Sequence, residues 1–346
     1  MRGAIGLGRA LVLASLPLAL APAPAAAAPA DPLPSLNLNP LRQIVYQHPD
    51  RGPLGAVAQG ELSGGLSVGY FAAFSSQERG DSSILLDLEG ARFDASLGWA
   101  PTDRIRVALD LPLIVYYDGV LDSVVEVVDR AVGTPSPQRK DVGQNDYHFR
   151  YQHATDSPFQ PAPGHFGLGD AALEARARLL DEDLEGWLPE LSATGVVEVP
   201  SGDPSLVHGN GAVDVAGEVE AARSLGDLRI SLALGFVVPG GAPDRLGGVS
   251  TRAAVSGLAA FGYAIGDAWQ LLAQVDYRQS PYGGSGLDVL KADSSELAVG
   301  LRFAPPSRGL SLEAGFVEGL VNGSSPDFSV VTSIACRFDG GGRNEP

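Results

Sequence analysis

Hydrophobic and polar residues alternate with a period of two along most of this chain. Between Leu228 and Val238, apolar side chains occupy every second position, while Arg229 and Ser231 fall on the opposite face. The segment from Trp269 to Arg278 repeats the pattern, with Gln270 and Asp276 on the polar face. Successive side chains of a strand point to opposite sides, so this period predicts strands rather than helices. The fold class predicted is therefore all-β.

About twelve such runs follow one another, each near the length of about 9–11 residues that crosses a bilayer as a tilted strand. They start near Gly64, Ser83, Asp103, Gly167, Leu188, Ala212, Leu228, Thr251, Ala268, Ser294, Gly309 and Phe328. The links between them alternate in length. Short links such as 101–102, 225–227, 265–267 and 305–308 alternate with longer ones at 75–82, 113–166, 201–211, 240–250, 280–293 and 319–327.

This alternation predicts an antiparallel transmembrane β-barrel of about 12 strands, with short periplasmic turns and longer extracellular loops. In hydrocarbon, only a helix or a closed barrel pairs every backbone group. A soluble periplasmic β-sandwich or barrel is the alternative, because half-buried strands of soluble sheets alternate in the same way.

The first residues indicate export. Arg2 and Arg9 precede and flank an apolar run from Ala10 to Leu20, which is too short to span a bilayer, and small residues follow it. We expect a signal peptide over residues 1–30, an irregular periplasmic segment over 31–62, the barrel over 63–338 and a tail over 339–346. An uncleaved anchor is the alternative for the first segment. The expected location is the outer membrane of a Gram-negative bacterium after signal-peptide cleavage.

Charge and composition narrow the partners. The net charge is −17, from 24 Lys+Arg and 41 Asp+Glu, which argues against nucleic acid, whose phosphates require a basic face. The one cysteine, Cys336, cannot form an intrachain disulfide or frame a metal site. We predict no cofactor and no metal. The expected partners are outer-membrane lipid, the barrel assembly and periplasmic chaperone machinery, and a small-molecule solute whose identity is unknown.

If the apolar faces meet lipid, the opposite faces line the lumen and carry both signs of charge. Such charges are costly unless paired, so we expect Arg–carboxylate pairs across strands. The predicted lumen-lining residues are Arg104, Arg106, Glu174, Arg176, Arg178, Glu198, Glu218, Glu220, Arg229, Asp276, Arg278 and Arg302.

The link 113–166 contains an apolar stripe at helical spacing. Leu121, Val124, Val125 and Val128 recur on one face, with acidic residues elsewhere on the turn. A short amphipathic helix in this extracellular loop either folds into the barrel mouth as a plug or packs on its outer rim. The sequence leaves both positions open.

No catalytic residues are predicted. Gly65 to Gly69 matches the G-x-S-x-G pattern around Ser67, but that motif requires a strand–turn–helix elbow, and here it lies within a strand. The link 113–166 contains His148, His153 and His165 together with acidic residues, so a loop metal site is the alternative there. Their spacing matches no recognised metal-ligand pattern, and we expect these histidines to be solvated.

Four short motifs carry a resemblance to a known family. They are Asn37-Leu38-Asn39-Pro40-Leu41, Gly167-Leu168-Gly169-Asp170, Val199-Pro200-Ser201-Gly202-Asp203, and Gly209-Asn210-Gly211 with Asp214; Asp118-Gly119 with Leu121-Asp122 adds to them. In this order they resemble an uncharacterised bacterial outer-membrane family, the domain of unknown function 3187. Two of them also resemble outer-membrane channels linked to aromatic-compound degradation. The resemblance implies a barrel that passes small solutes, with apolar molecules as a candidate class.

The function expected is a passive channel or transporter. One alternative is a non-conducting structural or binding barrel with a closed lumen. The other is an outer-membrane enzyme that acts on lipid, for which the sequence offers no constellation of residues. We therefore expect the protein not to be an enzyme.

Overall fold

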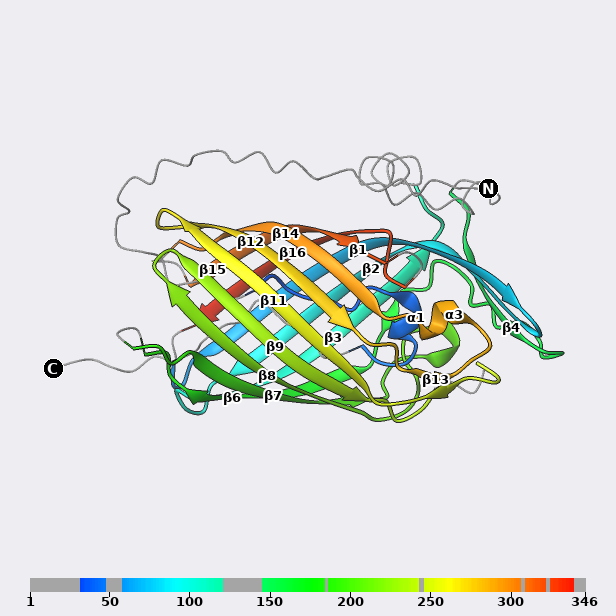
Figure 1. Cartoon of the computed structure of the whole chain (residues 1–346), viewed down its shortest axis with the longest axis horizontal. Helices are drawn as coiled ribbons and strands as arrows, with labels where there is room; N and C mark the ends of the chain where they lie inside the picture. Colours follow the sequence, from blue (N-terminus) through cyan, green and yellow to red (C-terminus); the bar gives the residue numbers. More distant parts are fainter. Residues whose placement is uncertain are drawn as a thin grey trace, which may run out of the picture.

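The computed structural model describes residues 32–47, 58–120, 145–183, 186–242, 246–305, 309–321 and 324–338. Within these residues, twelve antiparallel strands form a closed barrel, in which β1 pairs with both β2 and β16 (Figure 1). The barrel strands are β1 (Leu62–Arg79), β2 (Ser82–Trp99), β3 (Ile105–Tyr117), β6 (Ala171–Leu180), β7 (Glu190–Val199), β8 (Asp214–Leu225), β9 (Leu228–Val238), β11 (Ala254–Ile265), β12 (Trp269–Arg278), β14 (Ser294–Phe303), β15 (Leu310–Gly319) and β16 (Phe328–Phe338). The predicted fold class is confirmed.

Five shorter elements belong to the links. They are β4 (His148–His153), β5 (Gly167–Leu168), β10 (Ser250–Thr251), β13 (Tyr282–Gly284) and α3 (Asp288–Lys291). A further short helix, α1 (Pro40–Gln43), precedes the barrel in sequence, and a 3-10 turn spans Pro204–Leu206. No helix in the described ranges is long and apolar enough to cross a membrane. The helix predicted over residues 121–132 lies outside the described residues, as does the predicted signal peptide.

The two ends of the barrel differ. The longer links, together with α1 and α3, gather at one end, here called the loop end, while the last strand finishes at the other, the turn end (Figure 1). One predicted long link is wrong: residues 75–82 are mostly strand, because β1 and β2 continue past the barrel to a two-residue turn at Gly80 and Asp81. β4 pairs with this extension of β2, so His148 and His153 lie in a strand rather than in an irregular loop.

Side-chain burial follows the alternation of the sequence. Along β9, Arg229, Ser231 and Ala233 are buried, whereas Leu232 and Leu234 are 56% and 76% exposed. An apolar exterior around a polar interior is the arrangement of a membrane-spanning barrel. Large aromatic residues mark the two edges of the apolar band. Trp99, Trp269 and Phe338 are exposed at the turn end, and Phe236 and Tyr277 towards the loop end.

Candidate functional site

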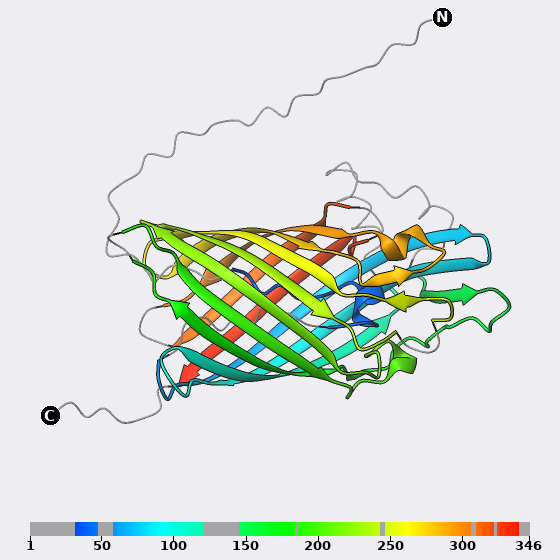
Figure 2. The same cartoon turned by 60° about the horizontal axis from the view of Figure 1, so that its bottom comes forward.

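The lumen contains part of the chain's own N-terminal region. Residues Pro32–Gln47, here called the plug, are all buried and run inside the barrel, where the segment appears in dark blue (Figure 2). This differs from the expected irregular periplasmic segment over 31–62. The physical reason is that the plug's leucines and amides find apolar and polar partners on the inward faces of the strands.

The first part of the plug follows the wall formed by β12, β14 and β15. Arg302 donates to the carbonyl oxygen of Pro32 at 3.2 Å. Ser35 donates to Asp276 at 2.7 Å and accepts from Arg278 at 2.7 Å. Leu33 occupies a notch made by two glycines that face each other across strands, because an added Cβ on Gly300 or Gly315 would lie 2.9 or 3.1 Å from it.

The tip of the plug is the short helix α1 at the loop end. Asn39 caps it by accepting from the Leu41 N–H at 2.9 Å, and Pro40 takes the first helical position, where no N–H is needed. The Asn39 amide also donates to the Ser324 carbonyl at 2.7 Å, and the Tyr282 hydroxyl donates to the Leu41 carbonyl. The loop-end links therefore hold the tip directly.

A single guanidinium fastens the base of this tip. Arg92 of β2 is fully buried, and its Nη1 donates to the carbonyl oxygens of Asn37 at 3.1 Å and Gln47 at 3.2 Å. The same side chain pairs with Asp94 at 2.8 Å. Asn37 precedes α1 and Gln47 follows it, so Arg92 closes residues 37–47 into a compact loop around the tip.

Apolar packing holds the plug against the opposite side of the lumen. Leu36, Leu38 and Ile44 join one buried cluster with Phe71 and Ile114 of the barrel wall. Gly69 of β1 makes the close approach possible, since a Cβ there would lie 2.6 Å from Leu38 Cδ2. The lumen wall formed by β1, β2 and β3 is thus apolar towards the loop end, and Leu36 and Leu38 of the plug pack against it.

Three of the sequence motifs, around residues 167–170, 199–203 and 209–214, meet at the Gln47 end of the plug. Asn210 donates to the Val45 carbonyl at 2.6 Å and to Asp214 at 2.8 Å. Gln47 donates from its amide to the His208 carbonyl at 2.7 Å and from its backbone to Glu198 at 3.0 Å. Motifs far apart in the chain therefore form one seat for the end of the plug, and their role in this structure is to hold it.

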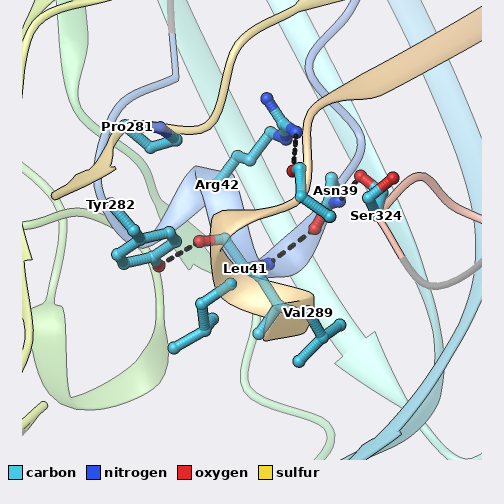
Figure 3. A pocket seen from close by; sticks show the side chains of 9 residues that line it. Asn39, Leu41, Arg42, Pro281, Tyr282, Val289 and Ser324 are labelled. Carbon is cyan, nitrogen blue, oxygen red and sulfur yellow. Dashed lines mark hydrogen bonds between the residues drawn. The ribbon is translucent and has the colours of Figure 1, made fainter. Parts of the chain in front are cut away.

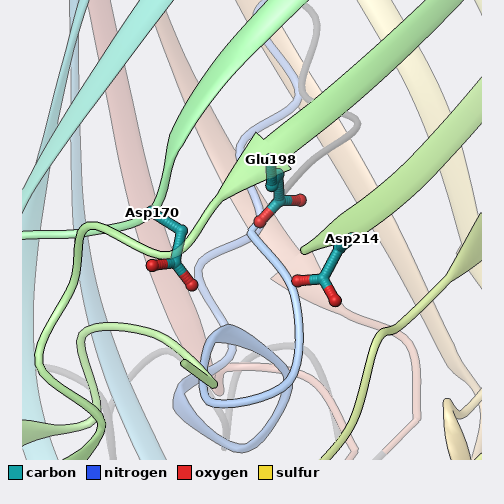
Figure 4. A group of neighbouring side chains, drawn as sticks. All are labelled: Asp170, Glu198 and Asp214. Carbon is teal, nitrogen blue, oxygen red and sulfur yellow. The ribbon is translucent and has the colours of Figure 1, made fainter. Parts of the chain in front are cut away.

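Three carboxylates lie together in this seat (Figure 4). Oxygen atoms of Asp170, Glu198 and Asp214 all lie within 4.8 Å of one another, and all three residues are buried. Asp170 accepts from the backbone N–H of Gly202 at 2.9 Å and of Asn210 at 3.2 Å. Burial raises the pKa of Asp170, and these N–H donors offset part of that rise.

Carboxylate oxygens are the ligands that hard cations prefer, so the three are the residues of the described chain that are able to hold a metal ion. Asp214 also accepts from the Gly240 N–H at 2.6 Å. The N–H donors on these carboxylates account for their arrangement as part of the seat. The nearby ring of His208 is buried as well, and burial lowers its pKa.

Most of the predicted lumen residues form ion pairs across strands, as expected. Arg106 pairs with Glu174 at 2.9 Å, Arg176 with Glu220 at 3.0 Å, and Arg278 with Glu296 at 3.1 Å. Arg302 pairs with Glu313, and Arg229 approaches Glu190 at 3.5 Å.

Other predicted residues occupy different surroundings. Arg104 is half-exposed at the turn end and pairs with Asp181, which Arg178 also contacts at 3.3 Å. Glu198 and Asp276 contact the plug, while Glu218 is partly buried on β8. Ser67 lies within β1 opposite Asp94 and Ser333, without the strand–turn–helix elbow that a nucleophile requires.

The sequence did not point to the plug itself. Asn37–Leu41 stood out as a motif, but nothing in an irregular segment shows which wall its side chains meet. The helix predicted over Leu121, Val124, Val125 and Val128, for which the sequence allows both the barrel mouth and the outer rim, lies outside the described residues. A cavity of about 10 Å³, room for about one water molecule, lies beside the tip between Arg42, Tyr282 and Ser324 (Figure 3).

The family is decided by a match over nearly the whole chain. The family described as "Protein of unknown function (DUF3187)" matches residues 10–338. The chain belongs to this family. The resemblance inferred from the motifs is confirmed, and these motifs form the plug tip and its seat. No curated protein has a significantly similar sequence.

A solved structure of similar fold is an outer-membrane channel. The COG4313 outer membrane channel from Pseudomonas putida F1 has a TM-score of 0.56 at 13% identity, covering 84% of this chain and 100% of that one. This likeness concerns the fold alone. The Ralstonia pickettii toluene transporter TbuX is 11% identical, with a TM-score of 0.37 and coverage of 83% of this chain and 91% of that one. A TM-score this low supports no inference. The fold of this DUF3187 protein is that of an outer-membrane β-barrel.

Proposed function

We propose that the protein is a passive channel for small solutes in the outer membrane, closed in this structure by its own plug. The carrying observation is that Pro32–Gln47 fills the lumen through hydrogen bonds and side-chain packing with the inward faces of the strands, while the barrel closes by pairing β1 with β16. These contacts are separate from the pairing between neighbouring barrel strands, so departure of the plug leaves that pairing intact.

The exterior supports the proposed location. Apolar side chains such as Leu234 and Leu232 are exposed along the strands, and exposed aromatic residues border them at both ends. In a membrane barrel this band faces lipid, and the barrel assembly and chaperone machinery of the periplasm is the expected route of insertion. Export by a cleaved signal peptide remains part of this proposal.

The test is single-channel conductance in a planar bilayer, with folding checked by the heat-dependent shift of gel mobility. The full-length chain is expected to show rare, brief openings, and a variant lacking residues 32–47 is expected to show long openings. Closed behaviour in both variants, from barrels shown to be folded, would contradict the channel.

A non-conducting barrel is the second candidate, because the plug is buried along its whole length and bound to opposite walls. It predicts silence from the full-length chain at any voltage that the bilayer withstands. The resemblance suggests apolar molecules as solutes. Such molecules would contact the apolar wall of β1, β2 and β3 only after the plug has left the lumen.

A further inference from the structure

The plug carries a buried cation at the loop end of the lumen. Arg42 is 3% exposed, and its guanidinium is held by three backbone carbonyl oxygens. Nη1 donates to Arg278 at 3.0 Å and Gln279 at 3.1 Å, and Nη2 donates to Ala292 at 3.1 Å. We call these three oxygens the carbonyl cradle. They come from the end of β12 and from the link before β14, so the barrel supplies the whole cradle and the plug supplies only its occupant.

A carboxylate lies beside the carbonyl cradle. Asp293 follows Ala292 directly, and burial raises its pKa, but the Tyr277 hydroxyl, the Ser280 N–H and the charges of Arg42 and Arg252 together bring this pKa below its usual value. Asp293 is thus a carboxylate near Arg42, and three carbonyl dipoles face the same guanidinium. These groups favour a cation at this point whether or not the plug provides it.

The wall below the carbonyl cradle carries more acids than bases. Among the described residues, the buried charges on inward faces of barrel strands are seven acids and five arginines: Asp94, Glu198, Asp214, Glu220, Asp276, Glu296 and Glu313 against Arg92, Arg106, Arg229, Arg278 and Arg302. A pore whose lining has an excess of one sign concentrates mobile ions of the other sign.

The shape of the carbonyl cradle selects among cations. A guanidinium is planar and presents several N–H donors in a rigid fork, which suits carbonyl oxygens placed around its edge. A quaternary ammonium has no N–H donor, so it would leave the three carbonyl oxygens without a partner.

We propose that the carbonyl cradle is a binding site for small guanidinium-type organic cations, that Arg42 fills it while the plug is docked, and that such cations are the solutes the channel admits. This inference rests on the proposed channel function. Entry of the solute from the loop end then competes with Arg42, which couples solute binding to release of the plug tip.

The experiment uses the full-length chain with Arg42→Ala, which empties the carbonyl cradle and keeps the Asn39 cap of α1. Arg79→Ala is the matched control, because Arg79 is an exposed arginine at the loop end that pairs with Asp288. Binding of methylguanidinium is measured by calorimetry in detergent micelles. We expect one site in Arg42→Ala with an affinity at least about tenfold above that of wild type or Arg79→Ala, and no comparable site for tetramethylammonium. Equal affinities in all three proteins would overturn the site.

Conductance separates the site from the channel. In bilayers, methylguanidinium is expected to reduce the potassium chloride current of Arg42→Ala, whose carbonyl cradle is empty. In Arg79→Ala it is expected to lengthen the openings instead, because there it displaces Arg42 and releases the plug tip. A salt gradient is expected to give a cation-selective reversal potential. An anion-selective potential would overturn the proposed solute class while leaving the channel in place. Silence from every variant, including the chain without residues 32–47, would refute the channel and with it the solute role, whereas the calorimetry would still decide the site.

Discussion

Single residues decide how tightly the plug is held. Arg92 joins both ends of the tip, and Asn39 both caps α1 and contacts the loop-end links. Gly69 has a different part, since it provides the space into which Leu38 packs. A side chain with several buried hydrogen bonds and a glycine without a side chain thus contribute to the same docking, one by attraction and the other by leaving room.

Replacing Arg92 with methionine is expected to loosen the plug strongly. The change removes both carbonyl contacts and leaves Asp94 without this cation, and breaking a buried pair costs about 3–5 kcal/mol. Maleimide labelling of Ser35→Cys in a Cys336→Ser background reports opening, because Ser35 is buried in the docked plug. Labelling is expected to be much faster in Arg92→Met than in Arg92→Lys, which keeps a charge for Asp94. If these two variants and the protein with Arg92 unchanged were labelled at equal rates, Arg92 would not hold the plug.

Adding a methyl group at Gly69 is expected to disturb the same docking from the wall. The new Cβ would lie 2.6 Å from Leu38 Cδ2, and overpacking of this kind costs about 1–3 kcal/mol. Gly69→Ala should therefore open several-fold more often in a planar bilayer. Gly195→Ala is the control, because nothing lies within 4 Å of a Cβ at that position. If both variants open alike, the close approach of Gly69 to Leu38 has no part in closure.

At the scale of elements, the plug belongs to two sides of the barrel at once. Leu36 and Leu38 pack on β1, β2 and β3, and Leu33 packs on β14 and β15. The polar groups at the two ends of the plug bind β12 and the seat at the ends of β7 and β8. The β1–β2 hairpin continues beyond the lumen and pairs with β4, so the loop end is built up around the tip. For the lumen to open, the plug has to separate from several strands at the same time. This favours two states, one with the plug fully docked and one with it released.

Docking is expected to depend on pH through the seat. Burial raises the pKa of Asp170 in the docked state, so this state binds a proton more readily than the undocked one. Docking is then strongest below the ordinary aspartate pKa and weakens as pH rises through the raised value. Through Asp170, open probability should increase from pH 4 to pH 7, whereas the lowered pKa of buried His208 acts in the opposite direction. Asp170→Asn should remove the increase that Asp170 contributes. An Asp170→Asn profile identical to that of the parent chain would show that Asp170 does not cause the pH dependence of docking.

The whole molecule is a barrel whose outer surface is adapted to lipid and whose inner surface is adapted to its own plug. Exposed apolar side chains lie between exposed aromatic residues at the two ends. Inside, charge pairs such as Arg106–Glu174 join neighbouring strands. The same twelve strands thus serve two environments, because alternate residues point to opposite faces.

The membrane orientation is tested by arginine substitutions at two depths. Leu234, in the middle of β9, is 76% exposed, and Leu225, at the end of β8, is 55% exposed. Leu234→Arg is expected to lower the free energy of unfolding in lipid vesicles by about 2–4 kcal/mol, and Leu225→Arg by about 0–1 kcal/mol. Denaturant titration of the refolded variants measures both. Losses of equal size at the two positions would argue that this band does not face lipid.

The sequence by itself determined the barrel, because alternation is a local property and every strand repeats it. The strand starts near Leu228 and Phe328 coincide with the observed ones, and cross-strand pairs such as Arg176–Glu220 follow from the inward polar face. Only the tertiary structure decided where the N-terminal segment lies. Ser35 and Asp276 are 241 residues apart, and Asn210 meets Val45 across 165 residues. An irregular segment has no period to show its buried side, so its place depends on long-range contacts that form only when the barrel has closed.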